Sequence, residues 1–173
     1  QTRGTNDYGL YIAGADTYSI FVDAGDCRFD GNVTMPGQPA FHAKPSSTQS
    51  DFAVGSDVTV VFGTEVFDQG ADFASNTFTA PVAGRYYLSA VIRMTTMDSA
   101  AAYYALNIQT SNRTYNMLMD PDFGQDAAHW TFSYSVLADM DASDTAFVVV
   151  NQNNGDQQTD IVTDSRFTGF LAC

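Results

Sequence analysis

The chain has 173 residues and a formal net charge of −13 at pH 7, and its 20 acidic side chains outnumber seven basic ones. So acidic a surface repels nucleic acid, and no apolar run approaches the ~20 residues of a membrane span, which argues against nucleic-acid binding and membrane insertion. Nineteen of the acidic residues are aspartate, which favours turns over helices, and this bias is typical of a β protein with many turns.

The N-terminal part differs from the rest because it repeats. Residues 8–17 match residues 18–27, with apolar side chains at alternate positions and a Gly/Asp turn, and residues 28–33 form a third, degenerate copy. This pattern is typical of stacked β rungs, which cannot bury their apolar face alone and need neighbouring chains or further repeats. We therefore expect a β-repeat stalk segment over residues 1–34. A simple β-hairpin packed on the main domain is the alternative.

A short break follows the repeats. Two prolines and a glycine within residues 35–39 support neither a helix nor a ladder of hydrogen bonds, so we expect a linker there and one head domain over residues 40–173. The chain starts at Gln1 instead of methionine, so we expect a piece of a longer polypeptide or a processed product. Cys27 and Cys173 are expected as free thiols, because two cysteines make no disulfide framework.

Residues 40–173 carry the pattern of an all-β domain. Apolar residues at alternating or consecutive positions predict strands at residues 40–44, 58–62, 86–94, 102–109, 114–119, 129–138, 145–151 and 166–172. Turns rich in Asp, Asn, Ser and Gly separate them, and no segment has the period of an amphipathic helix. Strands at such regular spacing predict a β-sandwich.

The stretch from Phe62 to Leu88 carries the densest aromatic pattern. Gly, Asp, Asn and Pro separate its rings, so short apolar strands alternate with turns. We expect this stretch to form one half of the core of the sandwich. The residues predicted to hold the core are Phe62, Phe73, Phe78, Gly84, Tyr86, Phe167, Gly169 and Phe170.

These residues resemble a known family, the globular head of complement C1q and its tumour-necrosis-factor-like relatives. The family's core pattern is followed by Phe62, Asp68, Phe73, Phe78, Gly84 and Tyr86. Its opening Ala-Phe-x-Ala is similar to residues 40–43, and its closing Phe-Ser-Gly-Phe-Leu is similar to Phe-Thr-Gly-Phe-Leu at residues 167–171. Leu88 and Ala90 stand where the family prefers aromatic residues, which indicates a divergent branch. The resemblance implies a jelly-roll head that forms a homotrimer around a three-fold axis.

The repeats resemble β rungs of another kind. Tyr-Gly-Leu-Tyr-Ile at residues 8–12 and Arg-Phe-Asp-Gly-Asn-Val at residues 28–33 are similar to rungs that precede the C-terminal domains of bacteriophage tail fibres and prophage adhesins. This resemblance implies a trimeric fibrous stalk, in a virion tail fibre that acts outside the host cell.

Residues for catalysis are scarce. His42 and His129 are the only histidines, and each is expected as a structural residue of a strand. The chain has no Gly-x-Ser-x-Gly, no His-Glu-x-x-His and no phosphate-binding glycine loop, although spacing cannot reveal an isolated pair of carboxylates. We therefore expect a protein that is not an enzyme and needs no cofactor, with calcium as the one ion to consider.

Weak calcium candidates lie in two acidic turns. One turn carries Asp139, Asp141 and Asp144, and the other carries Asp120 and Asp122. Oxygen ligands at alternate positions are typical of calcium loops, but the first turn lacks the Gly and the Glu that such loops carry at their sixth and twelfth positions. Turns capped by Asp need no metal, so plain turns are the preferred interpretation.

Receptor binding is expected at one end of the sandwich. Antiparallel strands run up and down in turn, so every second connection lies at the same end. If the last strand pairs with the first, the loops at residues 95–101, 120–128 and 152–159 lie at the tip far from the stalk. Binding residues concentrate in loops on a rigid scaffold. The candidates, whose amides and carboxylates suit sugar hydroxyls or a protein receptor, are Asp98, Asp122, Gln125, Asp126, Asn153, Asn154, Asp156 and Gln157.

The sequence thus predicts the trimeric tip of a viral tail fibre, which binds a host-cell surface receptor and most readily a glycan. Its expected partners are two copies of itself, the upstream fibre or other tail proteins, and a host surface glycan or protein. A secreted or cell-surface C1q-like lectin or adhesin without a virion is the first alternative. A purely structural virion decoration protein is the second.

Overall fold

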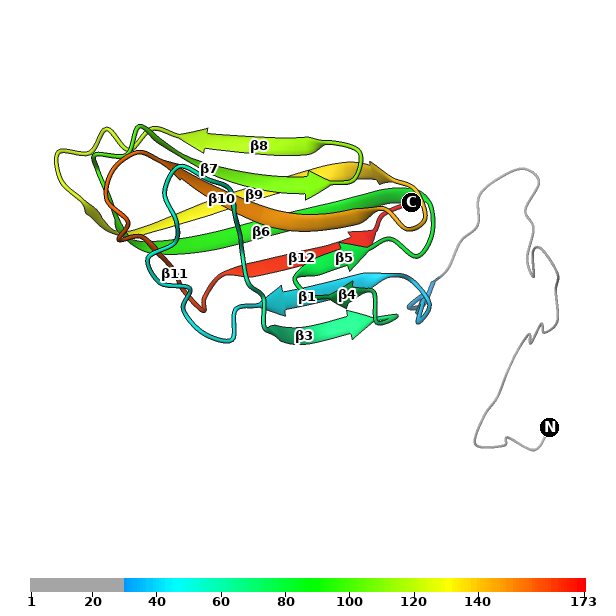
Figure 1. The fold of residues 1–173 in the computed structure, drawn as a ribbon. Coiled ribbons are helices and arrows are strands. Elements are labelled where there is room, and N and C mark those ends of the chain that lie inside the picture. The colour runs from blue at the N-terminus through cyan, green and yellow to red at the C-terminus, as the bar shows by residue number, and fades with distance from the viewer. Residues whose placement is uncertain (1–29) are drawn as a thin grey trace, which may run out of the picture. The chain divides into compact units, whose positions relative to one another are not determined.

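A computed structural model describes residues 30–173, and Figure 1 shows their fold. Met35–Cys173 form one compact unit. The described residues form strands and turns and no helix, and so contain no helix long and apolar enough to cross a membrane. The two full sequence repeats, Cys27 and most of the predicted stalk lie outside the described residues, and their predictions stay predictions. Residues 30–34, at the end of the predicted stalk, form no strand.

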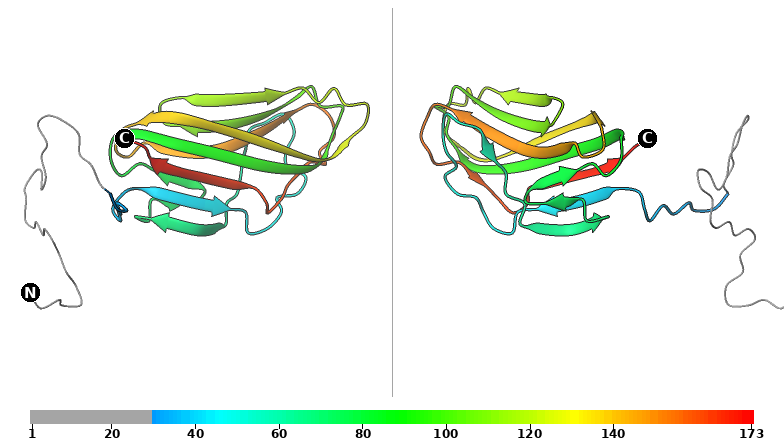
Figure 2. Two further views of the ribbon diagram at one scale, coloured as in Figure 1. Left: turned by 180° about the vertical axis from the view of Figure 1, so that it is seen from behind. Right: turned by 45° about the vertical axis from the view of Figure 1, so that its right-hand side comes forward.

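Two six-stranded antiparallel sheets pack face to face, as the views in Figure 2 show. Sheet A consists of β1 (Ala40–Lys44), β3 (Thr64–Gln69), β6 (Gly84–Met97), β9 (Ala127–Met140), β11 (Asp160–Ile161) and β12 (Arg166–Leu171). Sheet B consists of β2 (Val58–Thr59), β4 (Phe73–Ala74), β5 (Thr77–Thr79), β7 (Tyr103–Thr110), β8 (Thr114–Met119) and β10 (Thr145–Asn153). This is the predicted all-β jelly-roll sandwich.

The order of strands is β9–β6–β12–β1–β3 in sheet A, with β11 also beside β6. In sheet B it is β4–β5–β10–β7–β8, with β2 also beside β10. The closing strand β12 pairs with the entering strand β1, with Ala40 opposite Phe170 and Ala43 opposite Phe167. This pairing was predicted, and it brings the chain entry and the C-terminus to the same end of the head (Figure 1).

The core lies between the sheets, and the alternation of side chains along each strand builds it. On β6, Tyr86 and Leu88 are fully buried, whereas Tyr87 between them faces outward. Phe41 stacks on Phe73 with ring centroids 5.0 Å apart and on Phe78 with ring centroids 4.8 Å apart. Because each buried large side chain contributes about 1.5–3 kcal/mol, this aromatic cluster is a main source of stability.

Of the predicted core aromatics, Phe170 does not lie in the core. The buried ones are Phe62, Phe73, Phe78, Tyr86 and Phe167. Phe170 is 44% exposed, and its ring packs against Tyr87 with the centroids 5.4 Å apart. Side chains alternate along β12, so Phe167 and Gly169 face the core and Phe170 faces outward. The prediction for Phe170 followed the family motif and is wrong because of this period of two.

Gly84 and Gly169 lie where a side chain does not fit. A Cβ at Gly169 would lie 2.7 Å from the Leu88 side chain and 2.7 Å from the ring of Phe41. At Gly84 it would lie 2.7 Å from the carbonyl oxygen of Cys173. Both glycines therefore let the C-terminal strand and its last residues pack closely on the head.

The predicted strand at residues 58–62 is shorter in the structure. Only Val58–Thr59 pair with β10 as a strand. At the end of this segment, the backbone amide of Phe62 donates to Asn76 Oδ1 at 2.8 Å instead of joining a ladder. The segment still buries Phe62, so its apolar pattern predicted burial correctly and strand pairing incorrectly.

The predicted linker is tied to the head by side-chain amides. The two N–H groups of Gln69 Nε2 are shared among the carbonyl oxygens of Met35 at 2.9 Å, Pro36 at 2.8 Å and Gln38 at 2.7 Å. Gln38 Nε2 in turn donates to the carbonyl oxygen of Leu171. The path of the chain into β1 is therefore held from two neighbouring strands.

Candidate functional site

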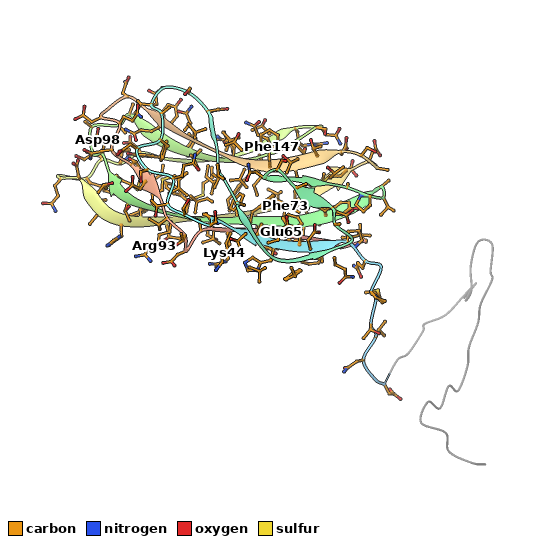
Figure 3. The ribbon with its side chains drawn as sticks, turned by 60° about the horizontal axis from the view of Figure 1, so that its bottom comes forward. Lys44, Glu65, Phe73, Arg93, Asp98 and Phe147 are labelled. Atoms are coloured by element: carbon orange, nitrogen blue, oxygen red, sulfur yellow. The ribbon has the colours of Figure 1, made fainter. Side chains whose placement is uncertain are left out.

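Three loops gather at the end of the head opposite the chain entry (Figure 1). They are residues 98–102 between β6 and β7, residues 120–126 between β8 and β9, and residues 154–159 between β10 and β11. Figure 3 labels Asp98 at this end. Their position agrees with the count of antiparallel strands, and we call them the tip loops.

A buried polar network supports the tip loops. Tyr104 Oη lies 2.9 Å from Thr159 Oγ1, which donates to Gln152 Oε1 at 2.9 Å. Gln152 Nε2 donates to the carbonyl oxygens of Asn154 at 3.1 Å and Asp156 at 2.8 Å. Burial raises the pKa of Tyr104, so its hydroxyl stays neutral. A buried network with satisfied hydrogen bonds rigidifies its surroundings, so these loops rest on a fixed base.

Asp98 belongs to this support. Its side chain is largely buried, and its carboxylate accepts hydrogen bonds from the backbone amides of Ala100 at 2.8 Å and of Asp156. Gly155 has a φ of +81° and comes so close that a Cβ there would collide with this carboxylate. The prediction that Asp98 contacts a receptor is therefore corrected, because both of its oxygens are used within the chain.

Asp126 joins the three tip loops to one another. Its Oδ1 accepts hydrogen bonds from the backbone amide of Ser99 at 3.0 Å and from Ser99 Oγ at 2.9 Å. Its Oδ2 accepts one from Gln158 Nε2 at 2.9 Å. The amide of Ser99 and the side chains of Gln158 and Ser99 lower the pKa of Asp126, because hydrogen bonds to a carboxylate favour its charged form.

A cleft of about 540 Å³ opens beside Asp126. Its lining residues are Asp51, Thr96, Asp126, Ala127, Ala128, Gln158 and Asp160. Asp160 Oδ1 accepts a hydrogen bond from the backbone amide of Asp51 at 2.9 Å, which fixes this carboxylate at the wall. The cleft therefore offers carboxylate, amide and hydroxyl groups, and the carboxylates suit ligands that donate hydrogen bonds. We call it the tip cleft.

Thr96 occupies a strained position in the wall of the tip cleft. Its φ is +50°, in the left-handed region that β-branched residues rarely adopt. Its hydroxyl donates to the carbonyl oxygen of Gln158 at 2.5 Å, which helps to hold this conformation. Backbone strain of this kind concentrates at ligand-binding sites.

The structure brings only part of the predicted site to the cleft. Asp126 lines it, and Gln157 reaches its edge because Gln157 Nε2 donates to the carbonyl oxygen of Asp51 at 2.6 Å. The other candidates lie in or beside the tip loops without lining the cleft, and these are Asp122, Gln125, Asn153, Asn154 and Asp156. Sequence reasoning missed Thr96, which is part of a strand, and Asp51, Gln158 and Asp160, which come from separate segments.

The calcium candidates do not gather in the structure. The part of the chain that the structure describes holds no group of three or more His, Cys, Asp or Glu placed to bind a metal ion. Asp144 Oδ2 accepts hydrogen bonds from the amide of Asp141 at 2.8 Å and from Asn112 Nδ2 at 2.7 Å. This carboxylate thus caps the turn between β9 and β10.

Neither histidine lines the tip cleft. His42 lies on β1 and packs edge-on against Phe67 with ring centroids 6.0 Å apart. Burial lowers the pKa of His42, and the neighbouring charges of Arg166 and Lys44 lower it further. His129 lies on β9 opposite Thr95. Both lie on strands, as the sequence predicted, and both strands belong to sheet A.

The two sheets, with β1 and β12 paired inside sheet A, define a jelly-roll sandwich of the C1q and tumour-necrosis-factor class. The family model of the C1q domain matches residues 40–172. The chain therefore belongs to the C1q domain family. Domains of this class form trimers, bind ligands, are typically not enzymes and are generally extracellular or secreted.

Solved structures of the class share this fold. The globular domain of zebrafish complement 1qA protein is 18% identical, with a TM-score of 0.59 over 79% of this chain and 98% of that chain. Murine APRIL is 12% identical, with a TM-score of 0.56 over 78% of this chain and 98% of that chain. At these identities the likeness shows the fold alone. No curated protein matches the chain in sequence.

Proposed function

We propose that this chain is the trimeric receptor-binding head of a viral tail fibre and that its tip cleft binds a host-cell surface ligand, most readily a glycan. The tip cleft carries this proposal. Its walls come from segments around residues 51, 96, 126 and 158 that are far apart in the sequence, and hydrogen bonds from Asp51 to Asp160, from Thr96 to Gln158 and from Gln158 to Asp126 join them. Rigid loops that present hydrogen-bonding groups in a cleft are typical of binding modules.

The outer face of sheet A supports the trimer. Leu137 lies opposite Tyr87, and Tyr87 lies opposite Phe170, so the three side chains form one row across β9, β6 and β12. They are exposed by 56%, 36% and 44% respectively. A contiguous apolar row on a sheet face marks a surface that a partner covers.

The side of the sandwich between β8 and β9 is a second apolar surface. Five partly buried side chains pack there against the core: Tyr115, Met117, Met119, Tyr134 and Val136. Contact between this surface on one copy and the sheet A row on the next joins two different patches. Such heterologous contacts close into a ring, and the family's trimers set the number of copies at three.

The assignment of this head to a virion is supported by the sequence repeats of residues 8–27. A secreted or cell-surface lectin or adhesin with the same head is the alternative. A sequence upstream of Gln1 with tail-assembly repeats favours the virion. A signal peptide with collagen-like Gly-x-y repeats favours the alternative.

Competition for the cell surface tests the tip cleft. We expect the purified trimer to bind host cells and to block adsorption of the virus, and Asp160→Asn with Gln158→Ala to weaken both effects. Asp160→Asn keeps an oxygen that can accept the hydrogen bond from the Asp51 amide, while it removes one of the three carboxylates that line the cleft. Asp164→Asn removes the same charge on a turn outside the cleft, where Asp164 forms an exposed ion pair with Arg93, and it should leave both effects unchanged because exposed ion pairs contribute little. Binding by the cleft variant equal to that of the parent would contradict the tip cleft, and no binding by the parent itself would favour a purely structural decoration protein.

A further inference from the structure

Two aromatic rings lie together at the tip end of β9. The ring of Trp130 packs against the ring of Phe123 with the centroids 5.2 Å apart, and Trp130 is 39% exposed. Phe123 belongs to the loop between β8 and β9, and Trp130 lies near the start of β9. Neither residue lines the tip cleft of its own copy. We call these two residues the aromatic pair.

The aromatic pair belongs to the side of the sandwich between β8 and β9, which we call the β8–β9 side. Trp130 lies opposite the buried Met94 of β6. Because side chains alternate along a strand, Trp130 points to the same side of β9 as Tyr134 and Val136. These two side chains are part of the apolar surface proposed for the trimer. The aromatic pair therefore continues that surface to the tip.

The tip cleft lies at the same level along the strands but on the other side of sheet A. Asp160 in its wall is opposite Thr95, and Thr95 is opposite His129, so these residues form one row across β11, β6 and β9. Since the neighbouring Met94 is buried, this row belongs to the outer face of sheet A. Trp130 directly follows His129 on β9. Within one copy, the cleft and the aromatic pair thus share a level and lie on opposite sides of the sheet.

The trimer proposed above brings the two features together. In each of its contacts, the outer face of sheet A on one copy meets the β8–β9 side of the next. The sheet A row (Leu137, Tyr87 and Phe170) and the tip cleft lie on this same face, and both include residues of β9 and β6. With the chain entries of all copies at one end, the three-fold axis runs along the strands, and rotation about it leaves each residue at its own level. Trp130 of the next copy therefore lies at the level of the tip cleft, on the surface that faces it.

The tip cleft of a single copy lacks an apolar surface for a sugar. A sugar ring presents hydroxyl groups at its edge and C–H groups on its faces. The carboxylates of Asp51, Asp126 and Asp160 suit the hydroxyl groups, but the described lining residues include no aromatic side chain and no apolar one larger than alanine. Aromatic rings suit the C–H faces. The aromatic pair thus supplies the chemistry that the cleft alone does not.

We propose that the binding site at the tip is completed between two copies of the chain. The tip cleft of one copy binds the hydroxyl groups of an uncharged oligosaccharide, and the aromatic pair of the next copy covers a face of its sugar ring. The three carboxylates repel anionic glycans, because no Lys, Arg or His is among the described lining residues. This composite site rests on the proposed function and deepens it, since it names the ligand class and requires the trimer.

Glycan binding by the trimer is the first test of the composite site. The probes are uncharged oligosaccharides of glucose, galactose, mannose and N-acetylglucosamine, compared with sialylated and sulfated ones on an array, and the best is titrated by calorimetry. We expect an uncharged probe to bind and Trp130→Ala to weaken it about tenfold or more, because a stacking surface is lost. Phe123→Ala, in a loop, makes the same test if Trp130→Ala does not assemble.

Tyr103→Ala is the matched control for the loss of a ring. Tyr103 is 36% exposed at the tip end of β7, and its neighbour Tyr104 is buried, so Tyr103 faces outward from sheet B and away from the proposed contact between copies. We expect Tyr103→Ala to bind the probe as the parent does. A loss equal to that of Trp130→Ala would contradict a specific role of the aromatic pair.

Mixed trimers show whether the cleft and the rings of one site come from different copies. Two versions of the chain with different affinity tags are produced together, one with Trp130→Ala and the other with Asp160→Asn and Gln158→Ala, and trimers that carry both tags are isolated. Each mixed trimer then has one contact at which an intact cleft meets an intact aromatic pair. We expect it to bind the probe with parental affinity at one site per trimer, whereas each pure variant binds weakly.

Other results overturn the composite site. If the mixed trimers bind as weakly as the pure variants, the cleft and the rings do not act across the contact. Binding by Trp130→Ala and Phe123→Ala equal to that of the parent removes the rings from the site, while the adsorption test of Asp160→Asn with Gln158→Ala still judges the tip cleft by itself. Failure of every uncharged probe, or loss of the trimer in both ring variants, overturns the composite site as well.

Discussion

The hydroxyl group of Tyr104 bonds to two of the tip loops. The backbone amide of Asp98 donates to it at 2.9 Å, and Thr159 Oγ1 lies 2.9 Å away. We expect Tyr104→Phe to cost about 1–3 kcal/mol of unfolding free energy, because it leaves buried polar groups unpaired. Urea unfolding measures this. Tyr103→Phe, at an exposed neighbour, should cost much less, and equal losses would contradict the role of the network.

The carboxylate of Asp126 makes the order of the tip loops depend on pH. Its pKa is lowered from 3.8, so its hydrogen bonds stabilise the folded loops fully above pH 3.8 and are lost as the pH falls through the lower folded value. We expect amide hydrogen exchange at Ser99, after correction for the intrinsic effect of pH, to rise as Asp126 becomes protonated. Asp126→Asn should remove this step, and the same step in that variant would contradict the assignment.

The sequence pattern predicted some residues of the tip cleft and missed others, for a physical reason. Asp126 was predicted because acidic loop residues commonly bind ligands. Asp160 and Asp51 were missed because the strands alone bring them to the same cleft. Asp98 was misassigned because the pattern of residues does not reveal that its carboxylate is buried against the amide of Asp156.

At the level of the strands, the close packing of β6 against the end of β12 requires that residue 84 has no side chain. A Cβ there would lie 2.6 Å from Leu171 Cδ1 and 2.7 Å from the carbonyl oxygen of Cys173. We expect Gly84→Val to lower the unfolding free energy by about 1–3 kcal/mol through overpacking. Thermal unfolding and light scattering measure the loss. An intact trimer of parental stability that has lost only receptor binding would contradict the separation of scaffold and tip.

Strand positions were largely predictable, and their irregular ends were not. The strand at residues 114–119 was predicted with its observed bounds, because its alternation is unbroken. The predicted strand at residues 58–62 ended early because the side chain of Asn76 takes the amide of Phe62. Such bonds between a side chain and a distant backbone group leave no periodic signal.

For the whole molecule, the sheet A row leads to a prediction about assembly. We expect Phe170→Asp to convert the trimer to monomers, because it places a charge in the proposed apolar contact beside Tyr87. Analytical ultracentrifugation measures the mass. Leu118→Asp makes the same kind of change on the outer face of sheet B and should leave the trimer intact. A trimer that survives Phe170→Asp would contradict this interface.

The hydrogen bonds from Gln69 to the segment before β1 affect how the head carries a pulling force. The chain enters β1 between β12 and β3, and the tip loops lie at the opposite end of the strands, with Asp126 and Gln158 in the wall of the tip cleft. If the tip cleft binds a host surface as proposed, tension between that surface and residue 39 acts along the strand axes, perpendicular to the hydrogen bonds of both ladders. The bonds on both sides of β1 are then sheared together and cannot open one by one. The amides at the entry share this load before it reaches β1.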